Sequence, residues 1–463
     1  MSRITGRRVR LAAAAVAALS IALVGCSAQP ASTDADGGSL VYLDAEIPTS
    51  AQVQESGTWQ TRALQQNITD RLLYRNPDTN QLEPWIAESW TVSPDGLTYT
   101  FVIRDGVTYS DGTDLDASSV AKNLEWQSAG DEAVGTTPNA QFPSGLAATA
   151  DDASRTVTVT LPEPYAPFLN VLTGWGSGLV ADATIDASKE DQSKFVNLIG
   201  SGPFVVTSET YGKEIVLERR DGYAWAPESS PNQGEAHLAQ VTVIPVQEDS
   251  VRLGTLTSGE ADVIRYVQPS EEQGLADAGY EIVSKTGVGL SNQWFLRPGA
   301  PHFDDIQVRR ALLHAIDREQ IIETQYTESW TAASSVLSPD TFGYVDESAK
   351  FEYDPDEANS LLDAAGWTER DSDGYRTKGG ERLTLKTYID VYDNTAKSLF
   401  QQIQNQFKDV GIELALNELD YSTYWATAFA DPEVGPLRVG WPHPDASKGL
   451  SEYYGSAGSD LLG

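Results

Sequence analysis

The only cysteine of this 463-residue chain is Cys26, so whatever folds beyond it must do so without an internal disulfide. A basic head precedes it, formed by Arg3, Arg7, Arg8 and Arg10, and residues 11–24 are almost entirely Ala, Leu, Val and Ile. A charged start followed by a short apolar run is typical of an export signal. The run is too short to span a bilayer comfortably, which takes roughly 20 residues. We therefore predict a signal peptide over residues 1–25 and a body stabilised by core packing.

The end of this segment resembles the lipobox of bacterial lipoproteins, because it reads Leu-Val-Gly-Cys at residues 23–26. The resemblance implies cleavage before Cys26 and attachment of lipid to its thiol. The protein is then expected outside the cytoplasm, anchored to the cell membrane. An ordinary signal peptide with an incidental cysteine is the alternative. Arg7 and Arg8 also leave the choice between the general and the twin-arginine export routes open.

The negative net charge of the chain disfavours anionic partners. Residues 1–25 hold four arginines and no acid, so the remaining 438 residues carry a net charge of −39, compared with −35 for the whole chain. Such a balance disfavours nucleic acid and anionic membrane surfaces as charge-driven partners. We interpret the acids as a solvated surface. The length suffices for two or three domains.

Alternating strand and helix patterns predict a mixed α/β protein with more than one lobe. Residues 26–38 lack bulky apolar groups after Cys26 and are predicted to form a lipidated flexible tether, roughly 20 Å long as a coil. Structure should begin with a strand at 39–43. Further strands are predicted at 97–103, 156–161, 210–219 and 239–245, and helices at 117–127, 307–326, 355–365 and 396–410. Asp116 is a candidate N-cap, while Gly366 and Gly411 stand where helices end.

The chain contains five sequence blocks, at residues 87–120, 200–204, 303–312, 314–319 and 353–367. In this order they resemble the extracellular solute-binding proteins of family 5, the oligopeptide, dipeptide and nickel binders of ABC importers. The first block is the longest, and it includes the turn Ser-Pro-Asp-Gly at 93–96. The second, Gly-Ser-Gly-Pro-Phe, should let backbone segments cross closely.

The resemblance implies a two-lobe fold of the periplasmic-binding-protein type, type II, in the large cluster with an extra subdomain in lobe I. Lobe I should cover residues 39–290 and lobe II residues 291–440. Residues 441–463 look like the start of a return into lobe I, which would be truncated at Gly463. By this resemblance the protein is a monomeric, non-enzymatic binder that needs no cofactor. It would close on a small solute, most often a short peptide, and deliver it to an ABC permease and ATPase.

The segments that cross between the lobes are expected to hold the ligand, because both lobes reach it there. The first candidate segment contains Asn292, Gln293 and Trp294, and the second contains Trp441 and Asp445. Residues 42–52 form the third. Trp59 and Trp175 are further candidate walls, since indoles offer a flat apolar face and an N–H donor. Each of these tryptophans has core packing as its alternative role.

One departure from the family pattern bears on the ligand. Peptide-binding relatives carry Gly-Trp, about two further residues, and then Asp-Tyr-Pro-Asp-Pro, whose first Asp anchors a peptide ammonium. Residues 444–445, Pro-Asp, align with the Pro-Asp of this pattern. Pro442 then stands at the position of the first Asp, and proline offers neither a side-chain acceptor nor a charge. Either Asp445 takes over the role or the ligand has no free amine at this point.

Two other function classes have weaker support in the sequence. The first is a secreted peptide or glycoside hydrolase. Neither Gly-x-Ser-x-Gly nor His-Glu-x-x-His occurs, while the many acids leave a carboxylate pair for sugar cleavage open. Direct metal binding is disfavoured because the four histidines, His237, His302, His314 and His443, are widely spaced. A metallophore or another non-peptide solute held by Arg and Trp remains open. A purely structural role at the cell surface has no positive feature.

Overall fold

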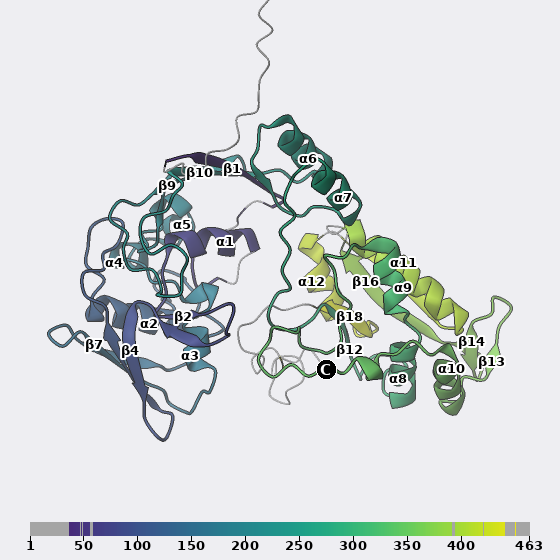
Figure 1. The fold of residues 1–463 in the computed structure, drawn as a ribbon. Coiled ribbons are helices and arrows are strands. Elements are labelled where there is room, and N and C mark those ends of the chain that lie inside the picture. The colour runs from purple at the N-terminus through teal and green to yellow at the C-terminus, as the bar shows by residue number, and fades with distance from the viewer. Residues whose placement is uncertain are drawn as a thin grey trace, which may run out of the picture.

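The computed structural model describes residues 37–46, 48, 50–55, 59–390, 394–419, 421–439 and 450. The chain folds into two lobes, with the N-terminal half on one side and the C-terminal half on the other (Figure 1). Each cluster of buried apolar side chains lies within one half, either at residues up to 243 or from 290 onward. The predicted α/β fold with two lobes is therefore confirmed.

The first lobe opens with a five-stranded sheet in the order β11-β1-β10-β9-β8. Strand β1 is parallel to both of its neighbours, β11 and β10, whereas β9 is antiparallel to both β10 and β8. Three strand segments fall where the sequence predicts them, at 39–44, 214–219 and 240–245. The bounds are β1 (Ser39–Asp44), β8 (Phe204–Thr210), β9 (Glu214–Arg219), β10 (Gln240–Pro245) and β11 (Val263–Ile264).

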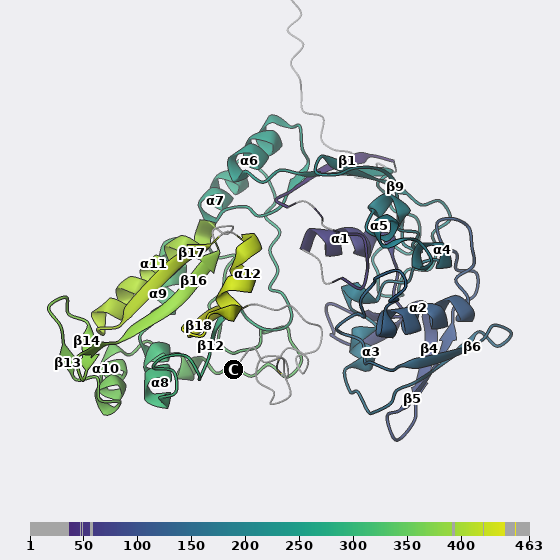
Figure 2. The same ribbon diagram turned by 180° about the vertical axis from the view of Figure 1, so that it is seen from behind.

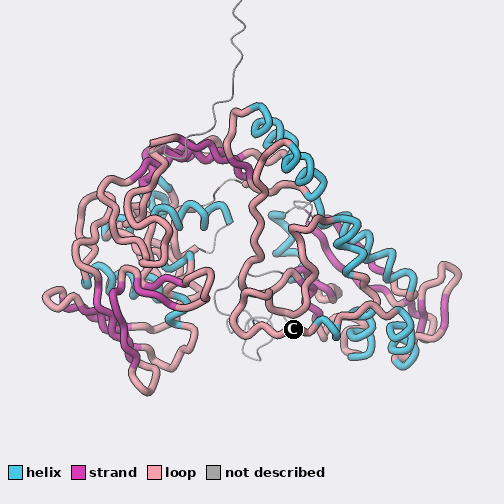
Figure 3. Tube along the Cα trace, in the orientation of Figure 1, coloured by secondary structure: helices cyan, strands magenta, loops and turns pink. Residues whose placement is uncertain are grey.

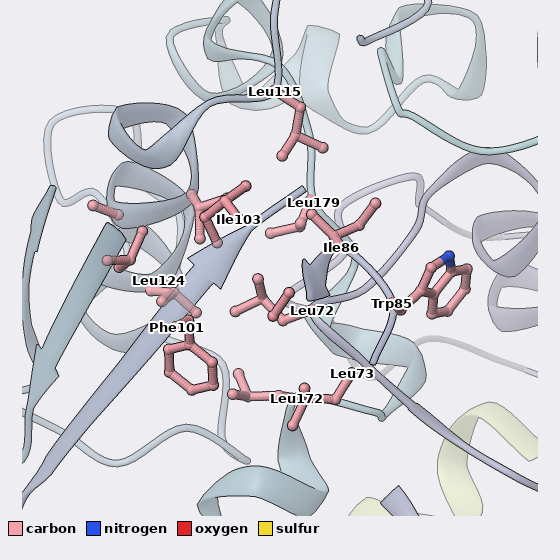
Figure 4. Close-up of a cluster of buried hydrophobic side chains, with 14 of the residues drawn as sticks. Leu72, Leu73, Trp85, Ile86, Phe101, Ile103, Leu115, Leu124, Leu172 and Leu179 are labelled. Atoms are coloured by element: carbon pink, nitrogen blue, oxygen red, sulfur yellow. The ribbon is translucent and has the colours of Figure 1, made fainter. Parts of the chain in front are cut away.

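A second, antiparallel sheet of the first lobe has the order β4-β5-β7-β6. Its strands are β4 (Ala87–Val92), β5 (Thr98–Ile103), β6 (Ala147–Asp151) and β7 (Thr156–Thr160). Along β7 buried valines alternate with more exposed threonines, as the period-two pattern predicts. Helix α2 (Ala117–Ala129) packs on this sheet, capped by the Asp116 carboxylate as expected. Figure 4 shows part of the core beneath it, including Phe101, Ile103 and Leu124.

Shorter elements complete the first lobe. Helix α1 (Trp59–Ile68) buries Leu64 and Ile68 against the five-stranded sheet. The hairpin of β2 (Leu73–Arg75) and β3 (Leu82–Pro84) follows it. The remaining elements are α3 (Phe168–Val171), η1 (Trp175–Ser177), α4 (Asp182–Ile185), α5 (Lys189–Gln192) and η2 (Phe195–Asn197).

Helices α6 (Asp249–Ser258) and α7 (Pro269–Asp277) join the lobes at one end of the molecule (Figure 2). A segment without helix or strand then leads into the second lobe, which Figure 3 shows as loop. Thr327 and Trp330 of the second lobe both donate hydrogen bonds to the Glu272 carboxylate on α7, the latter at 3.1 Å. Among the described residues, no helix is long and apolar enough to cross a membrane.

The second lobe contains a parallel pair, β16 (Thr384–Asp390) with β17 (Glu413–Leu419), and an antiparallel pair, β12 (Gln293–Leu296) with β18 (Pro436–Val439). A small sheet consists of β13 (Glu369–Arg370), β14 (Arg376–Lys378) and β15 (Glu381–Arg382). The other elements are α8 (Ile306–His314), α9 (Arg318–Gln325), η3 (Ser348–Lys350), α10 (Pro355–Ala364), α11 (Asn394–Asp409) and α12 (Tyr421–Ala430).

The helix predicted at 307–326 is wrong as a single element, because the structure divides it into α8 and α9. The Asp317 side chain accepts a hydrogen bond from the Gln320 backbone N–H and so begins a new helix. The other predicted helices lie where expected, and Gly366 and Gly411 both adopt positive φ after their helices.

Candidate functional site

A polar cluster lies at the carboxyl ends of the parallel strands β1 and β11, with Asp44 and Gln60 buried and Tyr266 exposed. We call it the edge cluster; it consists of Tyr42, Asp44, Gln60, Arg265 and Tyr266. The Asp44 carboxylate is buried and accepts hydrogen bonds from the Tyr42 hydroxyl at 3.2 Å and from the Gln60 amide at 2.9 Å. The Arg265 guanidinium lies 3.6 Å from the same carboxylate and 4.7 Å from the Tyr266 ring centroid.

A buried arginine, Arg252, holds the backbone next to the edge cluster in place. Arg252 on α6 donates to the carbonyl of Val246, which follows β10, at 2.7 Å, and to the carbonyl of Arg265, which follows β11, at 3.1 Å. The two strand ends are thereby held together. Tyr266 comes next in the chain with φ of 60°, an uncommon conformation for a non-glycine residue that the surrounding contacts must hold. Ligands of open α/β sheets bind beyond the carboxyl ends of strands, which makes this edge a candidate site.

A second feature of the first lobe is the Arg62 guanidinium, which lies close to two indole rings. The Arg62 guanidinium carbon lies 5.2 Å from the ring centroid of Trp59 and 4.2 Å from that of Trp175. Trp59 begins α1 and remains 43% exposed, whereas Trp175 belongs to η1 and is half-buried. The structure thus brings together two of the predicted site tryptophans. Helix α1 lies on the side of the first lobe that faces the second (Figures 1 and 2).

The three candidates of the second lobe lie at the start of strand β12, which contains Gln293 and Trp294 and directly follows Asn292. The Asn292 side chain accepts a hydrogen bond from Arg438 Nε at 3.2 Å, across the pair that β12 forms with β18. Gln293 Nε2 is buried and has no hydrogen-bond acceptor among the described residues. Trp294 stacks on Phe400 with ring centroids 5.3 Å apart and packs within the core of the second lobe. It therefore has a structural task, and its predicted ligand contact stays a prediction.

Other predictions lie outside the described residues. These are Trp441 and Asp445 in the second crossing segment, Pro442 beside them, and the lipid attachment residue Cys26. Among the residues that the structure does describe, no group of three or more His, Cys, Asp or Glu is placed to hold a metal ion.

Several residues of the edge cluster and its surroundings were not predicted from the sequence. Residues 42–52 were predicted as a segment, but Gln60, Arg62, Arg252 and Arg265 had no motif to mark them. The spacing from Trp59 to Arg62 was the one available signal, because residues three apart on a helix are neighbours. The pairing of Asp44 with Arg265, 221 positions later, follows only from the strand order.

Asp70, two residues after the end of α1, is a fully buried acid. It accepts hydrogen bonds from Trp225 Nε1 at 2.8 Å and from the Tyr223 hydroxyl at 3.2 Å. Burial raises the pKa of Asp70 to about 6, although these hydrogen bonds and the charge of Arg71 oppose the shift. The folded protein thus holds this proton more tightly than the unfolded chain, in which an aspartate has a pKa of about 3.9.

We expect the stabilisation that comes from protonated Asp70 to be complete below about pH 4 and lost as the pH rises through 6. Compared with Asp70→Asn, which stays neutral, the wild type should lose about 3 kcal/mol of unfolding free energy over this range. Chemical denaturation of both proteins from pH 4 to 7.5 measures the difference. Parallel pH curves for the two proteins would contradict the expectation.

The chain matches a known protein family over most of its length. The family model described as bacterial extracellular solute-binding proteins, family 5 Middle, matches residues 81–460. Over 341 residues the chain is 28% identical to the glutathione-binding protein GsiB of Escherichia coli O1:K1 / APEC. That match covers 73% of this chain and 62% of the relative. The chain thus spans about three fifths of the length of the curated relatives it matches.

Solved structures of similar fold include two whose bound molecules are known. DppA from Helicobacter pylori, in complex with the peptide STSA, has a TM-score of 0.71 at 23% identity and covers 89% of this chain and 80% of its own. NikA from Brucella suis, in complex with Fe(III)-EDTA, has a TM-score of 0.71 at 23% identity, with 87% and 79% covered. At this identity the likeness establishes the two-lobe periplasmic-binding-protein fold. Together with the family match over residues 81–460, it leads to one conclusion: the chain belongs to the bacterial extracellular solute-binding proteins of family 5.

Proposed function

We propose that this protein captures a small solute between its two lobes and delivers it to the permease and ATPase of an ABC importer. The observation that carries the proposal is membership of family 5, since the matched region covers most of both lobes. The protein acts as a binder and catalyses no reaction. A short peptide is the proposed solute.

Capture proceeds by closure of the lobes, which requires that the solute bind the closed form better than the open form. The edge cluster and the Trp59–Arg62–Trp175 stack form the wall of lobe I, residues 39–290. Asn292 and Gln293 belong to the wall of lobe II, residues 291–440. Trp441 and Asp445, which lie outside the described residues, are proposed as further ligand contacts, and residues 441–463 as the start of a return to lobe I.

One relative by sequence and one by structure support the choice of a peptide. GsiB is a glutathione-binding protein and DppA is solved with the peptide STSA. The stack of Arg62 between two indoles favours a second candidate, an anionic metal chelate, because it presents a cation beside flat apolar faces. NikA, which is solved with Fe(III)-EDTA, shares the fold.

The proposed location is the outer face of the cell membrane. A signal peptide over residues 1–25, lipid on Cys26 and a tether to residue 38 would hold the body close to the permease. The protein works as a monomer in this proposal, since a single chain supplies both lobes.

A solute screen tests the proposal. We expect one class among di- to hexapeptides, metal chelates and sugars to raise the unfolding temperature. A solute at 100 times its Kd should add about 2.7 kcal/mol of unfolding free energy. The same solute should reduce the radius of gyration in small-angle scattering, because the lobes close. If a well-folded protein responded to no class, or if a product were released, the proposal would fail.

The variant Trp59→Ala tests the site. Trp59 is 43% exposed, so its loss should change stability little while it lowers solute affinity about tenfold, or roughly 1.4 kcal/mol. Tyr211→Ala is the matched control, because Tyr211 is an exposed aromatic in the turn between β8 and β9. Calorimetry on the three proteins gives the affinities. Equal affinities would remove the stack from the site and leave the family assignment intact.

A further inference from the structure

Arg71 is a buried arginine whose hydrogen bonding differs from that of Arg220, Arg252 and Arg376. It is 7% exposed, yet its side chain donates no hydrogen bond to any residue that the structure describes. Arg220, Arg252 and Arg376 are equally buried, and each donates at least three. Even with its pKa lowered to about 10 by burial, Arg71 remains charged at neutral pH. A buried charge without hydrogen-bond partners is costly, which calls for a functional reason.

The unpartnered atoms of Arg71 have a specific arrangement. They are Nε and Nη2, which donate side by side along one edge of the guanidinium. This edge binds a carboxylate through two parallel hydrogen bonds. A third buried donor without an acceptor, Trp85 Nε1, belongs to an indole whose ring centroid lies 5.5 Å from the Arg71 guanidinium carbon. Nε and Nη2 of Arg71 have no acceptor among the described residues, and with the Trp85 ring beside them they indicate an anion site.

The position of these donors connects them to the movement of the lobes. Arg71 precedes β2 and Trp85 follows β3, so both lie at the base of one hairpin. Near the tip of that hairpin, the Asn80 side chain donates to the carbonyl of Asp340 in the second lobe at 3.4 Å. Trp85 is a buried member of the core of the first lobe (Figure 4), and its ring meets that of Tyr74 edge-on with centroids 5.8 Å apart. A change in the spacing of the lobes therefore acts directly on this hairpin.

We propose that Arg71 and Trp85 form a subsite for a carboxylate group of the captured solute. The inference rests on the proposed function and specifies one chemical group of its ligand. A carboxylate offers two oxygens side by side, which match the two adjacent donors Nε and Nη2 of Arg71. A phosphate group carries up to two charges, and the buried acid Asp70 next to Arg71 opposes the second.

A stability comparison tests whether Arg71 is kept for binding. Arg71→Met removes the unsatisfied donors and keeps an unbranched apolar stem, so we expect the unfolding temperature without solute to rise by roughly 2 °C. Arg220→Met is the matched control: Arg220 is 8% exposed, lies in the same lobe and donates to Ser201, Thr108 and Tyr109. Its loss should lower the unfolding temperature. An equal fall in both variants would assign Arg71 a structural role and overturn the proposal.

Acetate is the binding probe, exchanged for chloride at constant ionic strength. It should shift the Arg71 Nε–H resonance and raise the unfolding temperature of the wild type in a saturable way. Arg71→Met should lose this response, and Trp85→Phe should need severalfold more acetate. Inorganic phosphate should not replace acetate. A response that persists in Arg71→Met, no response in the wild type, or a preference for phosphate would each overturn the subsite.

The two proposals can fail separately. If acetate binds at Arg71 but no solute class is captured, the proposed importer function fails and a bare anion site remains. If a solute closes the lobes and acetate has no effect at Arg71, the subsite fails and the importer function stands.

Discussion

Replacing Gly200 by alanine is expected to lower the unfolding free energy by about 3 kcal/mol, through overpacking against a fixed backbone. A Cβ atom at this position would lie 2.0 Å from the carbonyl oxygen of Ile68, the last residue of α1. The glycine cannot shift freely, because its own carbonyl accepts a hydrogen bond from Ser110 at 2.9 Å. The close crossing predicted for the Gly-Ser-Gly-Pro block is thereby confirmed.

Urea denaturation followed by tryptophan fluorescence measures this effect. Gly254→Ala is the control, because Gly254 lies within α6 with nothing within 4 Å of its Cβ position. Alanine should stabilise that exposed helical site by about 0.5–1 kcal/mol. A Gly200→Ala protein as stable as the wild type would mean that α1 moves without cost. Solute affinity should then still report whether Trp59 and Arg62 have moved.

Arg252→Met is expected to destabilise the protein by about 3–5 kcal/mol, the range for removing one partner from a buried charged network. Arg252 is 1% exposed and donates to the carbonyls of Val246, Gln247 and Arg265 at 2.7, 2.8 and 3.1 Å. Methionine fills the space but leaves these carbonyls without their donor. Solute affinity should fall as well, since Arg265 belongs to the edge cluster.

The control for this variant is Arg310→Met, the same substitution at an exposed position of α8. It should change the unfolding free energy by no more than about 0.5 kcal/mol. Thermal and chemical denaturation of both variants, followed by calorimetry with the solute found in the screen, measures the two effects. If Arg252→Met matched Arg310→Met in both measurements, the strand ends would not depend on this arginine.

Local features were predicted from the sequence where local physics decides them. Asp116 caps α2 because its carboxylate reaches the Ser119 backbone N–H three residues on. Gly366 and Gly411 end helices because positive φ strains any other residue. The helix at 307–326 was predicted wrongly for the same kind of reason, since its apolar spacing concealed a second N-cap at Asp317.

The candidate site was predictable in part. Trp59 and Trp175 were selected as aromatic walls, and the structure places both on Arg62. Trp294 was selected on the same ground, yet it packs on Phe400 inside the second lobe. The sequence cannot separate these cases, because an indole suits a core as well as a binding surface.

The sequence alone determined the family and the α/β class, because both are written in contiguous residues, and it predicts an export signal over residues 1–25. Only the tertiary structure decided which charges meet. Asp44 lies beside Arg265, and Arg71 lies beside Trp85, because strand pairing and hairpin closure set those distances. Contacts of this kind depend on the register of strands far apart in the chain, and no local pattern records that register.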